Sequence, residues 1–150
     1  MQSIVYKSDR KILITLYTQY INKVIIISES VTNDLYATVV GISNYKGNQV
    51  FKLGSIIKLI KEPDNDFDTE AIMCELKYIG KTGYIANSTK TVIKGTMSAG
   101  RIYDKIGDVS FAKVKFIANE SVIGKILTPE EIKDLLKENE NDEFFNLERE

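Results

Sequence analysis

The stretch KEPDNDFDTEAI, residues 61–72, is the most informative part of the sequence, because it joins two apolar runs through turn-forming residues. It contains a proline, an asparagine and five acidic side chains, and Phe67 stands between Asp66 and Asp68. Such clusters between apolar runs are typical of connections between strands. We therefore expect a strand on each side. The carboxylates bind a metal, orient the loop or meet a ligand hydroxyl.

Short apolar and β-branched runs on both sides of this turn predict further strands. Alternating residues from Ile72 to Tyr78 are apolar or aromatic and are separated by Met73, Glu75 and Lys77, the period of a strand with one buried face. Several short strands separated by turns favour a small barrel or sandwich. The expected strands are 36–42, 50–53, 56–60, 72–78, 82–85, 109–118 and 121–127, with a hairpin turn at Gly80-Lys81.

One short helix is expected between the strands. Asn87 or Ser88 can cap a helix that runs to Lys94 and ends at Gly95. A single helix among strands is more typical of an OB-type barrel than of an all-strand sandwich. We therefore predict a mainly β fold, a small OB-like β-barrel with one short helix over residues 31–127.

Two extensions flank this barrel. Apolar residues at helical spacing predict a helix over 8–23, followed by a short strand at 24–27, although the stretch is also rich in strand-forming residues. At the other end, Thr128-Pro129-Glu130-Glu131 is a capping box with proline at the first helical position. The domains expected are an N-terminal extension (1–30), the barrel (31–127) and an acidic C-terminal helix and tail (128–150).

The acidic tail carries both charge and apolar side chains. Residues 128–150 hold three basic and nine acidic groups, whereas residues 31–127 hold 13 basic and 10 acidic groups. We expect 138–143 to be frayed or disordered. Phe144 and Phe145 would dock on the body or on a partner protein, or the tail is simply solubilising. The mildly basic body is compatible with a polyanion partner.

Composition excludes several kinds of site. The chain has 150 residues, one cysteine (Cys74) and no histidine. An intramolecular disulfide, a Cys/His zinc site and Ser-His-Asp or Cys-His catalysis are therefore excluded within one chain. No apolar run approaches the roughly 20 residues of a membrane helix, and the N-terminus lacks the order of a signal peptide. We expect a cytoplasmic protein with no cofactor and no membrane partner.

The acidic turn permits four interpretations. Asp64, Asp66 and Asp68 alternate as EF-hand ligands do, but Thr69 stands where that loop needs glycine. The same carboxylates could hold Mg²⁺ for a metal-dependent nuclease. Alternatively, Asp68 accepts a hydrogen bond from a ligand hydroxyl and a base stacks on the neighbouring phenylalanine, or both residues only shape the turn and the core.

The order of motifs over residues 35–127 resembles a HIRAN domain. The resemblance rests on Val39-Val40-Gly41-Ile42, a turn with Tyr45 and Gly47, the stretch 61–72, and Gly83-Tyr84-Ile85. It suggests a stand-alone bacterial or phage-type member of the family. It also implies an OB-like barrel that binds single-stranded DNA and captures a 3′-hydroxyl end.

Carried onto this chain, the resemblance implies that Asp68 accepts the 3′-hydroxyl and Phe67 packs on the terminal nucleotide. Asn65 would support the turn or contact the ligand, and Tyr84 occupies a pocket position. The chain departs from DNA-end-binding members, which have arginine-tyrosine at Ser43-Asn44 and a lysine at Asn87. We expect Tyr45, and Lys90 and Lys94 further on, to compensate.

These observations favour a nucleic-acid-binding module that takes single-stranded DNA or a DNA 3′ end and catalyses no reaction. A protein-interaction module that uses the acidic tail is the alternative, and a metal-dependent nuclease is a weaker one. Lysines and an arginine would attract phosphates. The predicted nucleic-acid-binding residues are Asn44, Tyr45, Lys61, Asn65, Phe67, Asp68, Tyr84, Lys90, Lys94 and Arg101, and no metal ligand or catalytic residue is predicted.

Overall fold

The computed structural model describes Gln19 and residues 34–148. The chain divides after Asp34, and the barrel and the C-terminal segment belong to one unit, Leu35–Glu150. Apart from Gln19, the expected helix at 8–23 and the expected strand at 24–27 lie outside the described residues.

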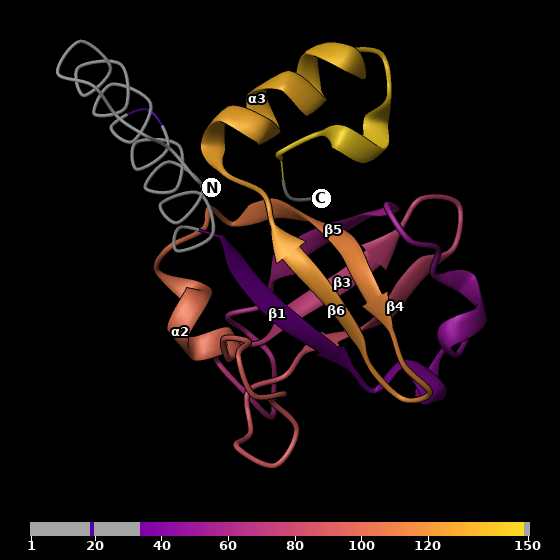
Figure 1. Cartoon of the computed structure of the whole chain (residues 1–150), viewed down its shortest axis with the longest axis vertical. Helices are drawn as coiled ribbons and strands as arrows, with labels where there is room; N and C mark the ends of the chain where they lie inside the picture. Colours follow the sequence, from indigo (N-terminus) through magenta and orange to yellow (C-terminus); the bar gives the residue numbers. More distant parts are fainter. Residues whose placement is uncertain (1–18, 20–33, 149–150) are drawn as a thin grey trace, which may run out of the picture. The chain divides into compact units, whose positions relative to one another are not determined.

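Within residues 34–148, antiparallel strands close into a barrel in the order β1-β4-β3-β2-β5-β6 (Figure 1). β1 pairs with both β4 and β6, so the sheet has no open edge. The mainly β fold class and the small OB-like barrel are confirmed. The strands are β1 Leu35–Val40, β2 Ile56–Lys61, β3 Ile72–Leu76, β4 Gly80–Ile85, β5 Val109–Ile117 and β6 Val122–Ile126.

The barrel interior is filled by alternate residues of these strands. Ile57 and Leu59 of β2 and Ile72 and Cys74 of β3 are fully buried and belong to the hydrophobic core. Burying each large aliphatic side chain contributes roughly 1.5–3 kcal/mol. Burial also raises the pKa of the Cys74 thiol, so this cysteine stays protonated. The residues between these positions face outward, and some of them line the sites discussed below.

Short helices fill the connections between strands, and one longer helix follows the barrel. The 3₁₀ helices η1 and η2 lie between β1 and β2, and α2 lies between β4 and β5. Among the described residues, none of the helices is long and apolar enough to cross a membrane. The helices are η1 Ile42–Asn44, η2 Asn48–Val50, α2 Ala99–Tyr103, α3 Pro129–Glu138 and η3 Glu143–Phe145.

The helix expected at 87–94 is wrong, because that segment forms turns alongside β1. Met97 N–H donates to the Tyr36 carbonyl at 2.7 Å, and Ile93 N–H donates to the Thr38 hydroxyl at 3.3 Å. The segment is rich in β-branched residues, which lose side-chain freedom in a helix. The short helix instead forms at α2, where the Ser98 side chain accepts a hydrogen bond from Arg101 N–H.

Two expected details between strands are also wrong. Residues 50–53 do not form a strand. η2 replaces its start, and Phe51 turns into the core with only 4% of its surface exposed. The β3–β4 hairpin turns at residues 77–79 rather than at Gly80-Lys81. Tyr78 takes the left-handed conformation there, with φ 66°, so Gly80 and Lys81 already belong to β4.

The helix start at the C-terminus is confirmed. Thr128 Oγ1 accepts from Glu131 N–H at 3.2 Å, and Glu131 Oε2 accepts from Thr128 N–H at 2.8 Å. Lys125 of β6 donates to the other oxygen of Glu131 at 2.9 Å. α3 is therefore anchored to the barrel at its first turn.

The expected fraying of 138–143 is wrong, because this stretch makes specific contacts. Asn139 Nδ2 donates to the Leu135 carbonyl at 2.8 Å, and Asp142 pairs with Lys77. The segment then turns into η3, whose N-cap side chain is Asp142. Phe144 and Phe145 pack against Phe111 of β5. Of the two predicted places for these rings, the body of the protein and a partner protein, the structure therefore shows the body.

Candidate functional site

A pocket of about 480 Å³ lies where the turn 61–72 meets β4, and we call it the aromatic pocket. It gathers side chains that are up to 42 residues apart in the sequence. Five predicted site residues line it: Tyr45, Asn65, Phe67, Asp68 and Tyr84. The full lining is Tyr45, Asn65, Phe67, Asp68, Ala71, Lys81, Tyr84, Ile85 and Asn87.

Asn65 organises the turn from within. Its Oδ1 accepts from the backbone N–H groups of Phe67 at 3.0 Å and Asp68 at 3.2 Å. Its Nδ2 donates to Glu62 Oε2 at 3.0 Å. An asparagine that bonds the amides two and three residues on is a typical turn device. Asn65 therefore supports the turn, as expected, and fixes the directions of the two side chains after it.

Asp68 is held by neutral donors. Its Oδ1 accepts from Glu70 N–H at 2.9 Å, and its Oδ2 accepts from Asn87 Nδ2 at 2.8 Å. Asn87 is tied in turn to α2, because its Oδ1 accepts from Gly100 N–H at 2.9 Å. A carboxylate offers about four acceptor positions. Asp68 is thus oriented and still able to accept a further hydrogen bond.

Tyr84, Glu62 and Lys81 form a polar network on one wall. The Tyr84 hydroxyl donates to Glu62 Oε2 at 2.7 Å and accepts from the Lys81 ammonium. Partial burial raises the pKa of Tyr84, and the bond from Lys81 offsets this only in part. Partial burial lowers the pKa of Lys81, but the bond to Tyr84 and the charge of Glu62 outweigh it and raise that pKa. At neutral pH the pair is therefore a cation beside a neutral phenol.

Lys81 is the site residue that the sequence interpretation missed. Its ammonium lies 4.4 Å from the ring centroid of Tyr84 and 5.5 Å from that of Tyr45. The sequence predicts Lys81 in a hairpin turn. Simple strand alternation would also place Lys81 and Tyr84, which are three residues apart, on opposite faces. A register shift between Cys74 and Glu75 of β3 accommodates this spacing. The isolated Gly83 inside β4 is the sequence signal that could have indicated such a bulge.

Two aromatic side chains are exposed to solvent at this site. Phe67 is 97% exposed, although its backbone is fixed by Asn65, and Tyr45 is 38% exposed. An exposed aromatic ring on an ordered turn contributes no burial to folding. Phe67 therefore does not fill the core, which was the structural alternative for this residue.

Gly83 lets β4 approach β1 beneath the pocket wall. A Cβ atom at this position would lie 2.6 Å from the Val40 carbonyl oxygen, which is backbone and cannot move aside cheaply. Val40 pairs with Tyr84 in the β1–β4 ladder. The glycine before Tyr84 is thus required by close packing, and this packing sets the position of the Tyr84 ring.

The other predicted site residues lie outside the pocket lining. Asn44 is exposed at the end of η1, and Arg101 is exposed on α2. Lys61 donates to the Ile106 carbonyl at 2.9 Å and lies over the Tyr103 ring. Lys90 and Lys94, expected to compensate for the lysine absent at position 87, are exposed in the loop after β4 and do not line the pocket.

The acidic turn does not assemble a metal site in the part of the chain that the structure describes. No group of three or more Asp, Glu, Cys or His side chains is placed there to hold an ion. Asp64 and Asp66 are exposed, whereas Asp68 faces the pocket with Asn87. The calcium and nuclease interpretations gain no support from this geometry.

Comparisons with known proteins are sparse. No protein-family model matches the chain, and no curated protein matches it either. Among solved structures, the chain is similar to the crystal structure of the HIRAN domain of human HLTF. The sequence identity is 22%, the TM-score is 0.44, and the match covers 70% of this chain and 87% of that one. The family assignment drawn from the sequence motifs stays a prediction.

Proposed function

We propose that this chain is a HIRAN-type nucleic-acid-binding module that takes the 3′ end of single-stranded DNA into the aromatic pocket without catalysing a reaction. The observation that carries the proposal is Phe67, which is 97% exposed on a turn whose backbone is already ordered. A base stacked on such a ring gains roughly 1–3 kcal/mol, and no loop has to be ordered on binding.

Lys81 supplies the charge that the proposal needs. Its ammonium lies between Tyr45 and Tyr84, which keep it at the pocket wall beside the exposed ring of Phe67. A phosphate of a bound strand would contact this cation, while Tyr45 offers a second stacking surface. Lys81 and Tyr45 thus take the roles of the arginine and tyrosine that the HIRAN motif has at Ser43 and Asn44.

Asp68 provides the polar recognition of a strand end. Both of its oxygens accept hydrogen bonds from neutral donors, Glu70 N–H and Asn87 Nδ2. A terminal 3′-hydroxyl can donate to a charged carboxylate in a short, strong hydrogen bond. An internal nucleotide has no such hydroxyl, which gives the pocket a physical basis for end preference.

The test compares oligonucleotides that end in a free 3′-hydroxyl or in a dideoxy nucleotide, by fluorescence anisotropy at several salt concentrations. The proposal predicts tighter binding of the free end, and binding of both that weakens as salt rises. Asp68→Ala should remove the difference between the two ends. If the blocked end binds equally well to the unaltered protein, end capture by Asp68 is wrong. Salt-independent affinity would contradict phosphate-led binding altogether.

A further inference from the structure

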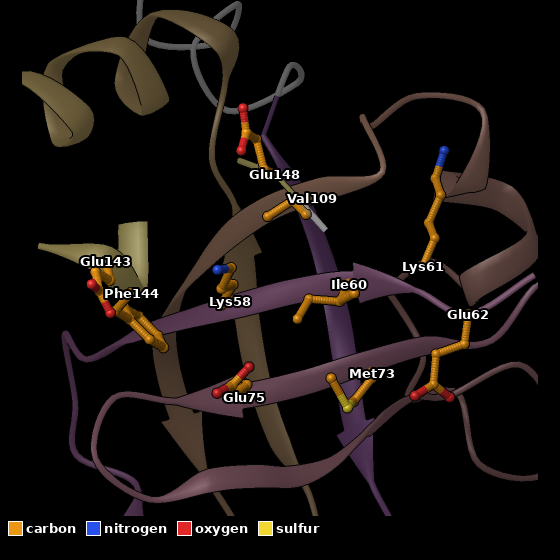
Figure 2. A pocket seen from close by; sticks show the side chains of 10 residues that line it. All are labelled: Lys58, Ile60, Lys61, Glu62, Met73, Glu75, Val109, Glu143, Phe144 and Glu148. Carbon is orange, nitrogen blue, oxygen red and sulfur yellow. The ribbon is translucent and has the colours of Figure 1, made fainter. Parts of the chain in front are cut away.

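A groove of about 490 Å³ lies beside the aromatic pocket, between the outer face of the barrel and the C-terminal segment 139–148. Its floor consists of Ile60, Met73 and Val109, which are cross-strand neighbours on β2, β3 and β5. Figure 2 shows these side chains on one side of the sheet, with Phe144 and Glu143 at one end and Glu148 above Val109.

The next cross-strand row on this face is Phe111, Lys58 and Glu75, and the C-terminal segment covers it. Phe111 lies outside the core cluster, yet none of its surface is exposed. The rings of Phe144 and Phe145 cover it, with centroids 6.5 and 5.7 Å away. Lys58 is 9% exposed, and its ammonium lies 5.8 Å from the Phe144 ring centroid.

The covered face is continuous with the aromatic pocket. Met73 on the groove floor pairs with Tyr84, which lines the pocket. Glu62 lines the groove and accepts hydrogen bonds from Tyr84 and Asn65. A strand bound at the pocket therefore has this face as an adjoining surface for its next nucleotides.

The docked segment determines the charge of the groove. The barrel contributes two lysines and two glutamates to the lining, Lys58, Lys61, Glu62 and Glu75, whose charges balance. The segment adds two negative charges, those of Glu143 and Glu148. In Figure 2, Lys61 points away from the floor, in keeping with its bond to the Ile106 carbonyl. With the segment in place the groove is thus acidic and repels phosphate, whereas without it the face offers an aromatic ring beside a lysine.

We propose that the outer face around Phe111 and Lys58 is a second contact surface for single-stranded nucleic acid, which the acidic C-terminal segment occupies in competition with it. Aromatic rings of the segment lie where bases would stack, and its carboxylates lie where phosphates would approach. This inference rests on the proposed function of the pocket.

The test uses two charge variants of the full chain that remove the same number of carboxylates from the region 138–148. Glu143→Gln/Glu148→Gln alters the groove, whereas Glu138→Gln/Glu140→Gln alters residues that do not line it. Anisotropy is measured with oligothymidines of about 4 and about 16 nucleotides, the range of single-domain site sizes. We expect the groove pair to bind the long probe about fivefold more tightly, and the control pair to stay close to the unaltered protein.

Three outcomes would overturn the inference: equal gains for both pairs, equal gains for both probe lengths, or no gain. Adding Lys58→Gln to the groove pair should cancel the gain for the long probe. Phe144→Ser/Phe145→Ser should also raise long-probe affinity, provided that circular dichroism confirms a folded barrel. The effect of Phe67→Ala on the short probe tests the pocket separately, so failure of the second surface is distinguishable from failure of the proposed function.

Discussion

Asn87 Nδ2 donates to Asp68 Oδ2 at 2.8 Å and so connects the loop after β4 to the β2–β3 turn. The donor is neutral, so it directs the carboxylate without cancelling its charge. A lysine at this position would form an ion pair with Asp68 instead. Under the proposed function, Asp68 is the hydroxyl acceptor of the pocket and Lys81 supplies its positive charge.

Replacing Asn87 tests this relationship. Asn87→Ala removes the bond to Asp68 and the acceptor for Gly100 N–H, so we expect a loss of about 1 kcal/mol of unfolding free energy and a weaker preference for a free 3′ end. Urea denaturation and anisotropy measure the two effects. Asn119→Ala, in the exposed β5–β6 turn, is the matched control and should change neither. An unchanged end preference in Asn87→Ala would show that Asp68 needs no such partner.

Asn65 should contribute more to the unfolding free energy than the acidic residues beside it. Asn65→Ala leaves the Phe67 and Asp68 amides without their acceptor, and we expect it to cost about 1–2 kcal/mol of unfolding free energy. Asp66→Ala, at an exposed position in the same turn, should stay within about 0.5 kcal/mol. Equal effects of the two substitutions in urea denaturation would contradict the role assigned to Asn65.

The pH dependence of stability should report on Lys81 and Tyr84. Both groups have a raised pKa in the folded chain, so the folded state binds their protons more tightly than the unfolded state does. Their contribution is complete below the unfolded values of about 10 and is lost as the pH rises through the folded values. Urea denaturation should show this loss above about pH 10, with a shallower fall in Lys81→Met. A Lys81 contribution that already fades between neutral pH and pH 9 would contradict the assignment.

The capping box at α3 should contribute measurably to stability. Thr128→Ala removes the acceptor for Glu131 N–H, and we expect a loss of about 1 kcal/mol. Thr128→Ser keeps a hydroxyl, so its unfolding free energy should stay within a few tenths of a kcal/mol of that of the unaltered protein. Hydrogen exchange would localise the effect to α3 and the segment after it. Equal stability of the two variants would mean that the box is not formed in solution.

The barrel could be predicted from the sequence because its strands carry their own pattern. Alternation in 72–78 and the turn residues of 61–71 predicted β3 and its neighbour, although β3 ends at Leu76 and Tyr78 lies in the turn. The same turn chemistry brought Asn65, Phe67 and Asp68 to one site. Local signals of this kind need no knowledge of the tertiary structure.

The errors lie where distant parts of the chain decide the outcome. Ser88 resembled a helix cap, but the Tyr36 carbonyl and the Thr38 hydroxyl hold the segment after it against β1. Lys81 reaches the pocket because its own strand, β4, has an extra residue, Thr82, where it pairs with Cys74 and Glu75 of β3. The docking of Phe144 depends on Phe111, which looked like an ordinary strand residue. None of these contacts is local in sequence.

We expect the exposed ring of Phe67 to stack on a base of the bound strand, and two aromatic variants test this. Phe67→Ala and Tyr78→Ala each remove an aromatic ring that is more than nine-tenths exposed, one at the pocket and one at the β3–β4 turn. Anisotropy with a single-stranded oligonucleotide should show binding by the unaltered protein, about 5- to 150-fold weaker binding by Phe67→Ala, and little change in Tyr78→Ala. Equal affinities of the two variants, or no binding by the unaltered protein, would contradict the account.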